Sequence, residues 1–80
     1  MLPRHLLGAR IPESRLENRI KVARAERGLS QEQLAKLAGV TRQTISSIET
    51  GQYAPSTLLA FVLAEVLDTP VTSLFTLRRD

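Results

Sequence analysis

The stretch that most constrains the fold is residues 31–51, which contain two short helical patterns separated by a glycine. Ser30 precedes the first pattern and Thr41 opens the second, and both residue types favour the N-terminal cap of a helix. Gly39 lies between the patterns, where a tight turn needs a backbone that tolerates a positive φ. The stretch therefore predicts two helices that meet at a short turn.

The second of these helices has one apolar side and one polar side. Ile45 and Ile48 supply the apolar side, while the other side has one guanidinium, one amide and three hydroxyl groups. These polar groups belong to Arg42, Gln43, Thr44, Ser46 and Ser47. Two helices joined by a short turn, with a polar face on the second, are typical of a helix-turn-helix, whose second helix enters the DNA major groove.

The remaining periodicity predicts helices on both sides of this pair. Ser14 and Glu17 match the capping-box pattern S-x-x-E, which predicts that the first helix begins near Ser14 and continues to about Arg27. The 4-3-4 spacing of its inner positions places one stripe toward the core. That stripe consists of Leu16, Ile20, Ala23 and Arg27, and Gly28 then ends the helix.

The other predicted helices complete an all-α fold. They span residues 31–38, 42–50, 57–67 and 71–75, with Gly51 ending the third helix. No credible pair of strands is present in the sequence. We therefore predict a five-helix bundle, preceded by an irregular or flexible arm over residues 1–13 and followed by a tail over residues 76–80. Residues 14–75 form the predicted DNA-binding domain.

The predicted helix over residues 57–67 is apolar nearly all round, with Glu65 as its one charged residue. Such a helix is normally buried on both sides, but a domain of this size covers only one. Either a second copy of the chain or the N-terminal arm is expected to cover the other side. For a second copy, the predicted interface residues are Leu58, Phe61, Val62 and Val66.

Positive charge is concentrated in the first half of the chain. Residues 1–42 contain nine Lys and Arg residues against four acids, whereas residues 43–77 contain three acids and no Lys or Arg. The basic half includes the start of the predicted reading helix. A polyanion is therefore the natural partner on that side, although a mixed solvated surface also accounts for the charge.

Composition argues against other classes of protein. The chain has no cysteine and one histidine, so neither a thiolate site nor a multi-histidine metal site is available in one chain. No cluster of acids suggests an enzyme, no cofactor is implied, and no small-molecule ligand is expected. The longest apolar run is far shorter than the roughly 20 residues of a membrane span. These features favour a cytoplasmic protein.

One combined pattern of residues extends through most of the chain. It consists of Arg19-Ile20-Lys21, Arg24, Gly28-Leu29-Ser30-Gln31, Leu34-Ala35, Gly39-Val40, Thr44-Ile45-Ser46, Ile48-Glu49, Gly51 and Pro55. With these residues, positions 18–75 resemble the Xre/Cro-type helix-turn-helix regulators, which share the DNA-binding domain of lambdoid phage repressors. The resemblance implies the fold of that DNA-binding domain and a homodimer that binds a pseudo-palindromic operator. It also implies a bacterial or phage-type protein that is associated with the nucleoid.

The resemblance also implies roles for individual residues. The positions that match base-reading residues are Thr41, Arg42, Gln43, Thr44 and Ser47. Gln31 matches a residue that bonds a phosphate, and Lys36, Ser46 and Tyr53 are further candidates for phosphate contacts. Arg24 and Glu49 match a buried salt bridge between the first and third helices.

Two functions remain open at this stage. The first is a transcriptional regulator, most simply a repressor, that binds double-stranded DNA as a dimer. The alternative is an antitoxin-like or other protein-interaction module that uses the apolar helix over residues 57–67 to bind a protein partner. Salt-dependent binding to duplex DNA would favour the first, and co-purification with another protein would favour the second.

Overall fold

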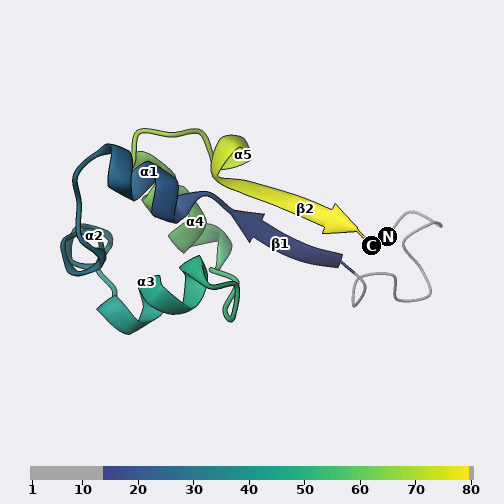
Figure 1. Cartoon of the computed structure of the whole chain (residues 1–80), viewed down its shortest axis with the longest axis horizontal. Coiled ribbons are helices and arrows are strands. Elements are labelled where there is room, and N and C mark those ends of the chain that lie inside the picture. The colour runs from purple at the N-terminus through teal and green to yellow at the C-terminus, as the bar shows by residue number, and fades with distance from the viewer. Residues whose placement is uncertain (1–13, 80) are drawn as a thin grey trace.

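The computed structural model describes residues 14–79, which form a body of five helices with a strand at each end of the described chain (Figure 1). The elements are β1 (Ser14–Asn18), α1 (Ile20–Glu26), α2 (Gln31–Ala38), α3 (Arg42–Glu49), α4 (Thr57–Val66), α5 (Val71–Leu74) and β2 (Phe75–Arg79). The predicted arm over residues 1–13 lies outside the described residues. No helix in the described part is long and apolar enough to cross a bilayer.

The core contains apolar side chains from every helix. The fully buried ones are Ile20, Leu34, Ile45, Ile48, Leu63, Leu67 and Leu74. Complete burial of one such side chain stabilises a fold by about 1.5–3 kcal/mol. Because α3 supplies both of its isoleucines, the helix is anchored along one side and its polar side remains outside.

Local sequence signals account for the starts of three helices. The Ser30 hydroxyl accepts from the Gln33 N–H at 3.0 Å, and the Gln33 side chain accepts from the Ser30 N–H at 2.8 Å, which is a capping box. Thr41 and Ser56 cap α3 and α4 through the same hydroxyl-to-amide bond. The turn between α2 and α3 contains Gly39 with φ +75°, as its position predicts.

The structure corrects the prediction for the two ends of the described chain. Residues 14–18 form a strand, not the first turns of a helix, and α1 begins only at Ile20. The predicted capping box at Ser14 is therefore wrong, and Leu16 and Arg27 lie outside the core. The expected absence of a strand pair is also wrong. Residues 75–79 form a second strand, although residues 76–80 were expected to form a tail.

The two strands form an antiparallel ribbon, which projects from one end of the helical body (Figure 1). We call β1 and β2 together the ribbon. In its register Leu16 lies opposite Leu77 and Arg15 lies opposite Arg78, so an apolar pair and a basic pair occupy neighbouring positions. The partners are about sixty residues apart in sequence, which is why no local pattern predicted them. The five predicted helices are confirmed, although α1 begins later than predicted and α1, α3, α4 and α5 each end one residue earlier than predicted.

Candidate nucleic-acid interface

The polar side of α3 is the centre of the candidate site. Arg42 and Gln43 are exposed on the first turn, and Ser46 and Ser47 are half-buried one turn later. The opposite side of the helix is fixed by Ile45 and Ile48 in the core. No bulky apolar side chain interrupts this polar side, so it presents hydrogen-bonding groups of the kind that read base edges in the major groove.

Two of the predicted base-reading residues hold the start of α3. The Thr41 hydroxyl accepts from the Thr44 N–H at 3.1 Å, and the two threonine hydroxyl oxygens lie 3.0 Å apart. This N-terminal cap satisfies an amide that has no partner within the helix. Thr41 and Thr44 therefore stabilise the start of α3 in the free protein, whereas the side chains of Arg42 and Gln43 are exposed to solvent.

The structure also brings Gln43 and Ser47 together. The Gln43 Nε2 group donates to the Ser47 hydroxyl at 3.3 Å, one turn further along α3. A glutamine amide both donates and accepts, which matches the N6 and N7 edge of adenine. The contact with Ser47 leaves the amide oxygen and one N–H of Gln43 available for a base.

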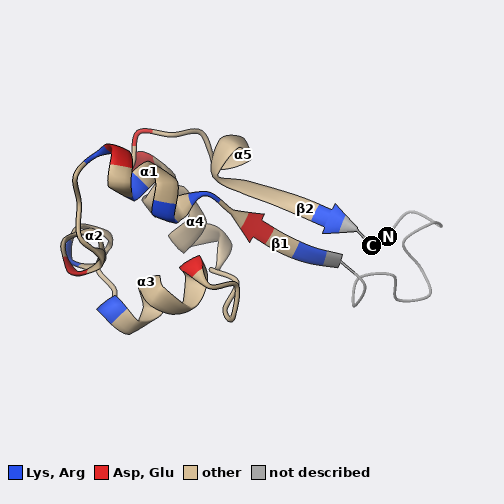
Figure 2. Cartoon of the chain, in the orientation of Figure 1, with Lys and Arg blue, Asp and Glu red and all other residues tan. Residues whose placement is uncertain are grey.

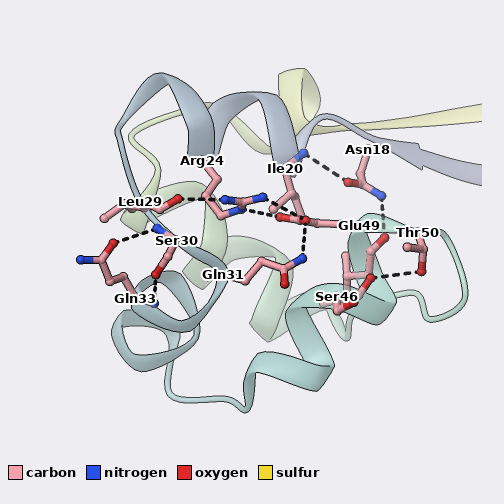
Figure 3. Close-up of polar contacts among 11 residues, drawn as sticks. Asn18, Ile20, Arg24, Leu29, Ser30, Gln31, Gln33, Ser46, Glu49 and Thr50 are labelled. Carbon is pink, nitrogen blue, oxygen red and sulfur yellow. Dashed lines mark hydrogen bonds and ion pairs between the residues drawn. The ribbon is translucent and has the colours of Figure 1, made fainter.

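The C-terminal end of α3 is fixed by a charged network around Glu49 (Figure 3). Arg24 of α1 donates from Nε to Glu49 Oε2 at 2.7 Å and from Nη2 to Oε1 at 3.3 Å. Gln31 of α2 donates to Oε1 at 3.0 Å, and Arg24 Nη1 donates to the Leu29 carbonyl at 2.9 Å. The Glu49 side chain is only 3% exposed and that of Arg24 14%. Paired and hydrogen-bonded in this way, the charges join three helices.

Gln31 combines this structural contact with a position that favours anions. It is the first residue of α2, where free backbone N–H groups and the helix dipole attract a phosphate. One N–H of its amide is bonded to Glu49, which orients the side chain and leaves the other N–H available.

The remaining phosphate candidates lie at separate places around the helix pair. Lys36 is exposed in the last turn of α2, and Ser46 is half-buried in the middle of α3. Tyr53 is exposed in the loop after α3, where its N–H donates to the Ser47 carbonyl at 3.2 Å. This bond fixes the loop against the end of α3.

Helix α4 leaves large apolar side chains in solvent. Leu58 is 76% exposed and Phe61 is 61% exposed, while Val62 and Val66 are half-buried. Leu63 and Ala64 on its other side belong to the core. Exposed large apolar residues that follow one another at helical spacing indicate a contact surface.

Two structural features of this region were missed from the sequence. The capping box of α2 matches the pattern S-x-x-Q at residues 30–33. The sequence therefore contains this signal, although the capping box was predicted only at residues 14–17. Asn18 bonds the end of α3, and no sequence signal reveals this because the contact joins residues thirty positions apart.

Comparison with known proteins identifies the family of the chain. The sequence model of the helix-turn-helix family HTH_3 matches residues 20–74, which is more than half of the chain. The chain belongs to the HTH_3 family. HTH_3 proteins are DNA-binding transcriptional regulators of the Xre/Cro type and not enzymes, which confirms the family, the fold class and the non-enzymatic function expected from the sequence.

Relatives of this HTH_3 protein occur in bacteria and archaea. YgzD of Bacillus subtilis, an uncharacterized HTH-type transcriptional regulator, is 40% identical over 65 residues, which cover 81% of this chain and 98% of YgzD. MJ0272 of Methanocaldococcus jannaschii, also an uncharacterized HTH-type regulator, is 45% identical over 60 residues, which cover 75% of this chain and 91% of MJ0272. The family therefore extends beyond the bacterial and phage origin that the resemblance implied.

Solved structures of regulators share the fold. The restriction-modification controller protein C.AhdI from Aeromonas hydrophila aligns with a TM-score of 0.66 and 38% identity, over 70% of this chain and 85% of the controller. The clp gene regulator ClgR from Corynebacterium glutamicum aligns with a TM-score of 0.63 and 25% identity, over 65% of this chain and 55% of ClgR.

Proposed function

We propose that this HTH_3 protein binds a pseudo-palindromic DNA operator as a homodimer and inserts α3 of each protomer into the major groove. The observation that carries the proposal is the orientation of α3. Its apolar side is anchored in the core, and its other side presents Arg42, Gln43 and Ser47 outward. Thr41 and Thr44 complete the proposed set of base-reading residues at the start of the helix.

The charge distribution supports this orientation. Figure 2 shows Lys and Arg on the ribbon, α1, α2 and the start of α3, whereas α4 and α5 have none. Phosphates attract basic residues without regard to sequence, and base edges then supply discrimination. We assign the phosphate contacts to Gln31, Lys36, Ser46 and Tyr53, and Arg42 reaches either a guanine edge or a phosphate.

The proposed dimer uses the exposed apolar residues of α4. Burial of Leu58, Phe61, Val62 and Val66 against a second copy would remove from water the largest apolar groups that α4 exposes. In a two-fold dimer on B-DNA, the two α3 helices lie about 34 Å apart, which is one helical turn. A dimer bound over a promoter blocks RNA polymerase, so we propose that the protein is a repressor. We place it in the cytoplasm, where the chromosome is transcribed.

Selection of bound sequences from random duplex DNA tests this function. We expect enrichment of two inverted half-sites separated by about one helical turn. Recovery of unenriched sequences would contradict sequence-specific binding, and enrichment of a single half-site would contradict the dimer. A protein that bound no duplex at low salt but co-purified with a second protein would support the antitoxin-like alternative.

A further inference from the structure

We propose that Asn18, the last residue of β1, is a positioning residue for base reading by α3. Its side chain bonds the C-terminal end of the reading helix and thereby sets the helix relative to α1 and the ribbon. This inference rests on the proposed function, because it assigns to Asn18 an effect on sequence discrimination and not only on folding.

The Asn18 side chain makes two hydrogen bonds to different elements (Figure 3). Nδ2 donates to the Ile48 carbonyl in the last turn of α3 at 2.8 Å, and Oδ1 accepts from the Ile20 N–H at the start of α1 at 3.2 Å. A flipped amide would place a donor against a donor and an acceptor against an acceptor, so only one orientation satisfies both partners. Asn18 therefore joins α1 and α3 through a single planar group.

The backbone around Asn18 is itself held by the ribbon. Asn18 lies opposite Phe75 in the antiparallel register, and the N–H of the next residue, Arg19, donates to the Leu74 carbonyl at 2.9 Å. The backbone that carries the Asn18 side chain is consequently held against α5 and β2. Figure 1 shows this junction where the ribbon leaves the helical body.

The last turn of α3 is thus held from three directions. The Ile48 side chain is buried in the core, its carbonyl bonds Asn18, and the adjacent Glu49 bonds Arg24 and Gln31. Ser47 belongs to this turn, and Gln43 lies one turn before Ser47. Because recognition requires side chains to be placed within about 0.5 Å, a shift of the last turn changes the base contacts of both residues.

Two substitutions separate this role from the local bond that Asn18 makes to the start of α1. Asn18→Ser keeps an uncharged side-chain oxygen that can accept from the Ile20 N–H at the start of α1, but its side chain is too short to reach the Ile48 carbonyl. Asn18→Asp keeps the shape and the acceptor and removes the donor. Thr69→Val is the matched control, because it removes a hydrogen bond at 2.9 Å to the Leu67 carbonyl, far from α3 in sequence.

The measurement is the ratio of affinities for the selected operator and for duplexes substituted at single base pairs, taken well below each melting temperature. Any effect of the negative charge that Asn18→Asp introduces on phosphate attraction largely cancels in this ratio. We expect both Asn18 variants to lower the ratio about fivefold, the effect of one lost hydrogen bond, and the Thr69 variant to leave it unchanged. Unchanged ratios in both Asn18 variants would overturn the positioning role while wild-type discrimination still supported the proposed function.

A measurement without DNA tests the contact independently. We expect amide hydrogen exchange at Thr50 and Gly51, just beyond α3, to be faster in Asn18→Ser than in Thr69→Val at equal overall stability. Equal exchange in the two variants would contradict the proposal. If the wild-type protein bound all duplexes equally, both the proposed function and the positioning role of Asn18 would fail. Faster exchange in Asn18→Ser would then show that the Asn18 contact only stabilises the fold.

Discussion

Replacement of Glu49 by glutamine tests whether the buried network fixes the domain. The Glu49 carboxylate accepts three hydrogen bonds, two from Arg24 and one from Gln31, and its side chain is 3% exposed. Glutamine has the same shape but a single oxygen, so its amide nitrogen must face a donor of Arg24 or Gln31. The change also leaves the guanidinium without its counter-charge. Breaking a buried pair from one side costs about 3–5 kcal/mol, and we take about 3 because Arg24 keeps its bond to Leu29.

This cost is large against the roughly 4–12 kcal/mol expected for a domain of 80 residues. At about 4–8 °C per kcal/mol, Glu49→Gln lowers the melting temperature by about 12–24 °C. Glu17→Gln is the matched control, because Glu17 pairs with Arg78 at 3.5 Å while its side chain is 47% exposed, and such a surface pair contributes about 0–1 kcal/mol. Thermal and urea denaturation followed by circular dichroism measure the two effects. A Glu49→Gln variant within about 0.5 kcal/mol of the Glu17→Gln variant would refute the reasoning.

Three further predictions concern reading, assembly and the turn. Gln43→Ala costs about 1–3 kcal/mol of operator binding and relaxes the preference at one base pair in each half-site, as measured by competition with substituted duplexes; an unaltered preference would contradict its reading role. Phe61→Glu shifts the protein to a monomer in sedimentation at tens of micromolar, whereas Val22→Glu on α1 leaves a dimer; a wild-type monomer at that concentration, without DNA, would contradict the α4 interface. Gly39→Ala costs about 1–2 kcal/mol because an alanine is strained at φ +75°, although no atom beyond the adjoining residues lies within 4 Å of the added Cβ; an unchanged urea midpoint would contradict this strain.

Local signals predicted most of the helical body. Helix α2 has the predicted bounds, because Ser30 and Gly39 mark its two ends by cap chemistry and backbone conformation. The outward face of α3 also follows from its own spacing, since Ile45 and Ile48 fix which side is buried. Each of these inferences depends on residues within one or two turns of one another.

Contacts between distant residues could not be predicted in this way. The pattern S-x-x-E at residues 14–17 satisfies a helix-start rule, but its residues pair with residues 76–79 instead. The ion pair between Arg24 and Glu49 was expected only from the family resemblance, and the Asn18 contact was not anticipated at all. In each case the partner is at least twenty-five positions away, where periodicity and capping rules provide no information.

The ribbon affects the order in which parts of the domain unfold. Its strands bring together residues about sixty positions apart, but the helical body already closes this loop, because the Arg19 N–H donates to the Leu74 carbonyl at 2.9 Å. Beyond this closure the ribbon adds only one antiparallel ladder and a Leu16–Leu77 pair whose members stay 38% and 57% exposed. A lone two-stranded unit of this kind is marginally stable by itself. We therefore expect separation of β1 from β2 to cost less free energy than loss of the helical body, so that the ribbon opens while α3 stays packed on the core.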